Sequence, residues 1–156
     1  VYIAQAIENP SNASSLAEKA KAQLDIAARI NANAPEVHAN LASVSLMQGN
    51  AYAAYNSANK ALSSGLRGDN AAGVNGVKGS AAIVIARYSE AVSAESAAAN
   101  TADNLFNKGL AQVLNKDYQN ALTSFGEASR LNSNHALAYY GAAVASARLG
   151  NADGVI

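Results

Sequence analysis

The chain has 156 residues, of which 50% are hydrophobic, 6% aromatic and 14% charged. Its 11 basic and 11 acidic residues cancel, and no Lys/Arg cluster lies along a predicted helix, which argues against nucleic acid or an anionic membrane surface as a partner. The absence of Cys excludes disulfides, a thiolate zinc site and a cysteine nucleophile in this chain. No apolar run approaches the roughly 18 residues of a membrane-spanning helix.

The N-terminal part of the chain is predicted to contain a short helix and a longer one. Residues 2–8 carry apolar side chains on one side, and Pro10 ends that helix. Asn12 or Ser14 can cap the next helix. Its single apolar stripe is formed by Leu16, Ala20, Leu24, Ala27 and Ile30.

A pair of helices is expected next. Pro35 suits the first turn of a helix, and Gly49 with Asn50 ends it. Residues 52–62 then supply the partner helix, with apolar side chains at helical spacing.

A loop is expected over residues 64–70, because this stretch opens a glycine-rich segment and each Gly lowers helix propensity by about 1 kcal/mol relative to Ala. The helix after it continues to Ala86. A short partner helix is predicted over residues 88–99.

The clearest hairpin lies between Asn104 and Leu131. Apolar residues recur at helical spacing, are interrupted by residues 115–117, and then resume. Small residues at Gly109 and Ala121 let the two helices approach closely. A further helix is predicted from Leu137, with Gly150 and Asn151 ending it, and residues 152–156 would begin its partner.

One sequence unit is repeated with a shift of thirty positions. Residues 78–81 and 88–92 have the same layout as residues 108–111 and 118–122. A hairpin of this size cannot bury both of its faces alone, so we expect copies of it to stack into a solenoid.

The pattern resembles the tetratricopeptide repeat (TPR). Its signature places a small residue twelve positions before an Ala and an aromatic residue four positions later, as do Gly109, Ala121 and Phe125. The twelve-residue step recurs from Gly79 to Ala91. The large aromatic expected early in each unit is absent from several units, so the repeats are degenerate, and another two-helix solenoid is the main alternative.

The resemblance implies an all-α fold, an α-solenoid of antiparallel helical hairpins in a right-handed superhelix. We expect one domain over residues 1–156 with approximate units 1–34, 35–70, 71–101, 102–134 and a truncated 135–156. Because the chain begins mid-pattern at Val1 and stops at Ile156, we expect a fragment or a processed form. Low charge and abundant Asn and Ala suit a secreted bacterial protein and favour the periplasm or cell envelope over the cytoplasm.

No catalytic, metal or cofactor site is predicted. His38 and His135 are the only histidines and lack suitably spaced partners, and Glu90 and Glu95 are five residues apart, off a common helical face. We therefore expect no enzyme activity. Tyrosines could bind sugars, but most occupy turn or packing positions of the repeat, so core packing is expected for Tyr52, Tyr55, Tyr88, Tyr118, Tyr139 and Tyr140.

The function that the resemblance implies is a non-catalytic protein-interaction scaffold, whose first helices line a concave groove for a peptide or a helix. The alternative is an envelope-associated solute-binding or glycan-binding protein built on the same frame. A protein, a peptide or another copy of this chain is the expected partner. The ligand-facing positions of the repeat correspond here to Leu46, Met47, Ile83, Val84, Phe106, Leu110, Val113, Leu114, Tyr140, Val144 and Arg148.

Overall fold

The computed structural model describes residues 3, 5 and 12–153, and over these residues the chain is all helical, with no strand. The helix expected over residues 2–8 lies outside the described residues, apart from Ile3 and Gln5. The described helices are α2 (Ala13–Ile30), α3 (Pro35–Met47), α4 (Ala51–Ser63), α5 (Gly68–Val84), α6 (Tyr88–Ala97), α7 (Ala102–Leu114), α8 (Tyr118–Leu131) and α9 (Ala136–Asp153).

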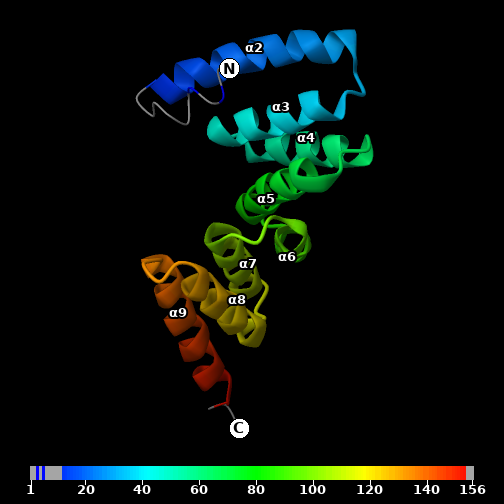
Figure 1. Ribbon diagram of the computed structural model, residues 1–156. Coiled ribbons are helices and arrows are strands. Elements are labelled where there is room, and N and C mark those ends of the chain that lie inside the picture. Colours follow the sequence, from blue (N-terminus) through cyan, green and yellow to red (C-terminus); the bar gives the residue numbers. More distant parts are fainter. Residues whose placement is uncertain (1–2, 4, 6–11, 154–156) are drawn as a thin grey trace.

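The helices form an elongated stack in chain order, with α2 and α9 at opposite ends (Figure 1). Each helix packs against the next one along the chain, and α3, α5, α7 and α9 also contact one another in succession. These four helices therefore line one side of the stack, while α4, α6 and α8 cover the other. This is the arrangement of an α-solenoid built from helical hairpins.

The core is built mainly from alanine, which lets the helix backbones lie close together. Many alanines of α4 and its neighbours are fully buried, among them Ala42, Ala54 and Ala58. Phe125 and Val44 are the largest fully buried side chains of the described part. The core is therefore thin and close-packed, in keeping with an aromatic content of only 6%.

The turns inside successive hairpins share one backbone conformation. Gly49, Ala86 and Lys116 each adopt a positive φ, of 74°, 60° and 63°. Each follows the first helix of its hairpin and precedes the second, where a left-handed residue ends a helix. The repetition predicted from the sequence is thus present in the backbone.

Two predicted helix boundaries are wrong. The loop expected over residues 64–70 is shorter, because α5 already begins at Gly68. The helix expected to end at Gly150 and Asn151 instead runs to Asp153, so residues 152 and 153 continue α9 and do not begin its partner. A Gly in a helix costs only about 1 kcal/mol, which does not by itself end one. The remainder of the expected partner, residues 154–156, lies outside the described part.

The prediction of core packing is also wrong for several tyrosines. Tyr55 is buried, but Tyr52, Tyr139 and Tyr140 are 65%, 54% and 70% exposed. Tyr139 and Tyr140 lie on α9, the last helix that the structure describes. Within the described residues, no helix has the length and apolar character needed to cross a membrane.

Candidate functional site

An apolar pocket of about 230 Å³ lies between α7, α8 and α9. Two exposed side chains of α9, Leu137 and Tyr140, stand at its opening with 60% and 70% exposure. Apart from the Tyr140 hydroxyl, the side chains around it offer no hydrogen-bonding group. The pocket is lined by Phe106, Leu110, Val113, Phe125, Leu137, Tyr140, Gly141 and Val144.

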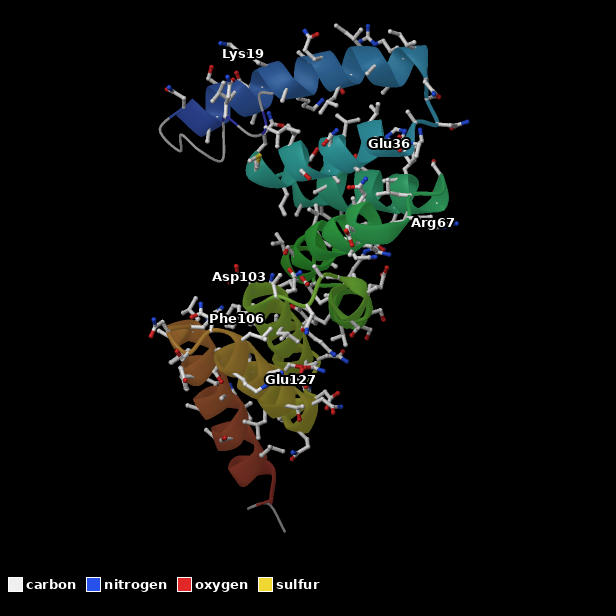
Figure 2. The ribbon with its side chains drawn as sticks, viewed as in Figure 1. Lys19, Glu36, Arg67, Asp103, Phe106 and Glu127 are labelled. Atoms are coloured by element: carbon white, nitrogen blue, oxygen red, sulfur yellow. The ribbon has the colours of Figure 1, made fainter. Side chains whose placement is uncertain are left out.

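Phe106 links this pocket to a polar pair at its edge. Its ring lies 5.7 Å from the ring of Phe125 and 5.1 Å from that of His135, measured between centroids. His135 Nε2 lies 3.3 Å from the carboxylate of Asp103, which is largely exposed. Asp103 and Phe106 both come from the first half of α7, on the side of α9 (Figure 2). These contacts hold one wall of the pocket in place.

The sequence-predicted groove residues fall into separate groups. Phe106, Leu110, Val113, Tyr140 and Val144 come together at the pocket. The others do not line it, and several of them pack elsewhere.

Leu46 and Ile83 are partly buried against the core cluster that contains Tyr55. Met47, Val84 and Leu114 are 42%, 69% and 40% exposed, and Arg148 is also exposed. Val84 lies instead at a shallow hollow beside the turn at Gly49.

Three residues of the pocket were missed by the sequence analysis, namely Phe125, Leu137 and Gly141. Phe125 was named only as the aromatic residue of the repeat signature, although its ring also reaches the first helix of the next hairpin, α9. Gly141 lies directly against that ring, because a Cβ there would come within 2.6 Å of it. The thirty-two-residue step from Gly109 to Gly141 was a signal that could have identified this contact.

A second hollow, of about 400 Å³, lies between α3 and α5 and is mainly polar. It includes the carboxylates Glu36 and Asp69 and the amides Asn40 and Asn70. No aromatic ring lines it. The same side of the stack therefore changes from polar near α3 to apolar near α9.

Tyr55, Arg87 and Glu90 form a network of polar contacts between α4 and the start of α6. The hydroxyl of Tyr55 donates a hydrogen bond to Glu90, and Arg87 Nη1 lies 3.2 Å from the other carboxylate oxygen. The Tyr55 hydrogen bond, followed by the charge of Arg87, lowers the pKa of Glu90. Arg87 also stacks 4.8 Å from the Tyr55 ring centroid. This network ties α4 to the start of α6.

The described residues contain no group of three His, Cys, Asp or Glu side chains that would hold a metal ion. His38, buried near the start of α3, has its Nε2 2.8 Å from the Ala32 carbonyl oxygen. His135 is the residue that packs on Phe106. Each histidine thus has a local packing partner.

No known family profile matches the sequence, and no curated protein matches it either. Several solved structures, however, match the fold of this chain. YrrB, described as a TPR protein with an unusual peptide-binding site, superposes with a TM-score of 0.78 at 21% identity, over 96% of this chain and 77% of YrrB. PilF of Pseudomonas aeruginosa gives 0.72 at 24% identity, over 96% and 68%.

A tetratricopeptide repeat protein from Parabacteroides merdae gives a TM-score of 0.71 at 18% identity, over 97% of this chain and 60% of that protein. At these identities the likeness concerns the fold. The stacked hairpins described above are those of TPR proteins.

Proposed function

We propose that this chain, which has the tetratricopeptide-repeat fold, is a non-catalytic scaffold that holds an apolar segment of a protein or peptide. The apolar pocket between α7, α8 and α9 carries the proposal. It is open to solvent, and Leu137 and Tyr140 stand exposed beside it. Apolar side chains gathered around a hollow in this way are typical of a binding surface.

The chemistry of the pocket favours an apolar anchor as its ligand. Burying an exposed aliphatic or aromatic side chain contributes roughly 1.5–3 kcal/mol before ordering costs. Two such side chains, Leu137 and Tyr140, together with the partly exposed Leu110 and Val144, could therefore support specific binding. YrrB, a protein of the same fold, is described as having an unusual peptide-binding site, which supports the choice of a peptide as the ligand.

The hollow between α3 and α5 is the proposed binding place for the other end of the ligand. Its carboxylates and amides suit polar or basic groups, whereas the α7–α9 pocket suits apolar ones. The ligand is therefore a segment that is apolar at one end and polar or basic at the other. Sugar binding is less favoured, because no aromatic ring lines the polar hollow for a sugar to stack on.

The proposal is tested by selecting displayed random peptides on the purified protein and measuring the affinity of enriched peptides by calorimetry. The pocket variant Leu137→Asp/Tyr140→Asp changes exposed side chains and should keep the helical circular dichroism. It should weaken binding at least tenfold, since about 1.4 kcal/mol of contact energy corresponds to tenfold in affinity.

The matched control is Leu131→Asp/Tyr52→Asp, which alters two exposed apolar side chains outside the pocket. It should bind the selected peptides as the unaltered protein does. Equal binding by both double variants, or equal loss in both, would contradict the assignment of the pocket. Sedimentation velocity run in parallel shows whether a second copy of the chain occupies it.

A further inference from the structure

Glu95 of α6 occupies a position where the repeat places an aromatic ring. It precedes Phe125 by thirty residues, as Gly79 precedes Gly109. In the later hairpin the Phe125 ring packs against Gly109, and in the earlier one the Glu95 side chain packs against Gly79. A carboxyl group therefore stands in the core where the repeat predicts an aromatic ring.

The carboxyl group has no hydrogen-bond partner in the described part of the protein. Glu95 is 4% exposed, and neither Oε1 nor Oε2 has a partner there. The amide of Asn107 lies nearby, but its Nδ2 donates to Ser80 Oγ at 3.2 Å. Nearly all buried polar groups in proteins are hydrogen-bonded, so this one requires an explanation.

Burial decides the charge of this group. Desolvation raises the pKa of Glu95 to about 8, and the influence of the Asn107 amide lowers it only in part. A Glu in water has a pKa of about 4.3 and is ionised at neutral pH, whereas this carboxyl keeps its proton while it is buried. If it ionises, it needs a cation or water.

Within the described residues, no salt bridge supplies that cation. On α5, Lys78 Nζ lies 5.7 Å from the centre of the Tyr55 ring. Lys108 of α7 and Glu127 of α8 line a hollow at the end of α6, but the carboxyl oxygens of Glu95 have almost no accessible surface and do not open into it. The other charged groups nearby have partners of their own, Arg87 with Glu90 and Asp103 with His135.

The two ends of α6 are held in different ways. Its start is tied to α4 by the contacts of Tyr55 with Arg87 and Glu90. Its last turn carries Glu95 and packs between α5 and α7 in the middle of the stack (Figure 1). Terminal turns of helices open at a low cost in free energy, so this turn can open while the start of α6 stays in place.

We propose that the last turn of α6 is a pH-sensitive latch, which stays packed between α5 and α7 while the Glu95 carboxyl is protonated and opens to water when that carboxyl ionises. Water then solvates the carboxylate, which has no cation in the packed state. The polar hollow and the apolar pocket lie on either side of α6 along the chain, so opening of the latch loosens the contact between the two halves of the stack.

The direction of the pH effect follows from the protons that each state binds. Glu95 has a pKa of about 8 in the packed turn, and in the open turn it has the ordinary value of about 4.3. Raising the pH from about 5 to about 8 therefore favours the open turn by up to about tenfold per pH unit. Above pH about 8 both states are ionised, and the effect levels off.

The test is amide hydrogen exchange of the full chain between pH about 5 and about 9, read by NMR and expressed as protection relative to an unstructured chain at the same pH. Protection of residues 94–98 should fall by up to about tenfold per pH unit until pH about 8, while that of α3 should change little. The carboxyl carbon signal of Glu95 should titrate well above pH 4.3, the ordinary value of about 4.3 being that of an exposed Glu.

Two variants remove the ionisable group, and a third is the matched control. Glu95→Gln and Glu95→Met should keep the protection of residues 94–98 constant over this pH range. The Met side chain is apolar and flexible, so it covers the case in which the Gln variant does not fold. Glu127→Gln removes an exposed carboxylate beside the same turn and should retain the full pH dependence.

A pH dependence that persists in Glu95→Met would overturn the proposal. So would constant protection of residues 94–98 in the unaltered protein, or a Glu95 carboxyl signal that titrates near the ordinary value of about 4.3. These measurements use no ligand, so failure of the latch and failure of the proposed peptide site are distinguishable.

Discussion

The ring of Phe125 determines how closely three helices approach at the C-terminal end of the stack. It is 1% exposed and lies between α7 and α9. A Cβ added at Gly109 would come within 2.7 Å of the ring, and one at Gly141 within 2.6 Å. Both helices therefore need glycine at these positions.

This close contact predicts opposite effects for two identical substitutions. Gly109→Ala should lower the free energy of unfolding by about 1–3 kcal/mol, because the added methyl group overpacks the ring. Gly126→Ala in α8 meets nothing within 4 Å and should raise it by about 0.5–1 kcal/mol through helix propensity. Urea unfolding followed by circular dichroism measures both. Effects of the same sign would show that Phe125 does not set this spacing.

Residues that occupy repeated positions could be predicted from the sequence better than residues that depart from them. The spacing of Gly109, Ala121 and Phe125 predicted a hairpin, and all three are buried in it. The spacing of Glu95 from Glu90 does not indicate that Glu95 is buried, whereas its register with Phe125, thirty residues later, does. The pKa of Glu95 follows from burial, which a single sequence does not reveal.

At the scale of the elements, one buried hydrogen bond joins the two helices of the α7–α8 hairpin. Ser124 Oγ of α8 donates to Gln112 Oε1 of α7 at 2.7 Å. Gln112 and Ser124 are 5% and 3% exposed. Both side chains are buried, so loss of the bond would leave the Gln112 amide without water or a hydrogen-bond partner.

We expect Ser124→Ala to lower the free energy of unfolding by about 1–3 kcal/mol, since it leaves Gln112 unsatisfied. Ser129→Ala is the matched control in the same helix, because Ser129 bonds only to the backbone carbonyl of Gly126 in an exposed position. It should change stability by less than about 0.5 kcal/mol. The double variant Gln112→Leu/Ser124→Ala should cost less than the sum of the single changes, as thermal unfolding of all four proteins would show.

Helix boundaries were predicted well where turn residues interrupt an apolar pattern and poorly where only glycine did. Residues 115–117 separate α7 from α8 as expected. Gly150 was expected to end a helix, yet it lies within α9, and Gly68, inside the expected loop, is the first residue of α5 with a left-handed φ of 63°. A helix that packs against a neighbour along its length gains more from burial than one glycine removes, and this balance depends on tertiary contacts.

At the scale of the whole molecule, the candidate pocket depends on how hairpins stack, because its lining residues come from α7, α8 and α9. Positions taken from the repeat predicted part of it, namely Phe106, Leu110, Val113, Tyr140 and Val144. The same positions also predicted Leu46 and Ile83 as groove residues, but these two side chains are partly buried against the core cluster around Tyr55. Whether an apolar side chain on a first helix faces a ligand or the next hairpin depends on how neighbouring units are rotated, and sequence spacing does not fix that angle.

The stack as a whole predicts that stability is distributed along the chain and not concentrated at one centre. Helices in the middle have neighbours on both sides, and the two clusters that hold Tyr55, Leu66 and Val74 involve α3 to α7. In a solenoid each unit is stabilised mainly by its nearest neighbours. Amide hydrogen exchange should therefore be slowest in α4 and α5 and faster in α9.

Because each unit is stabilised mainly by its neighbours, a substitution should affect hydrogen exchange only in the helices near it. Gly109→Ala disturbs the contact of α7 with α8, so it should speed exchange in α7, α8 and α9 severalfold or more, while amides of α3 and α4 should change little. Mass spectrometry of peptides from the exchanged protein measures each helix separately, with Gly126→Ala as the reference variant. Equal acceleration in every helix would mean that the chain opens only as a single cooperative unit. In that case its stability could not be treated as a sum over neighbouring hairpins.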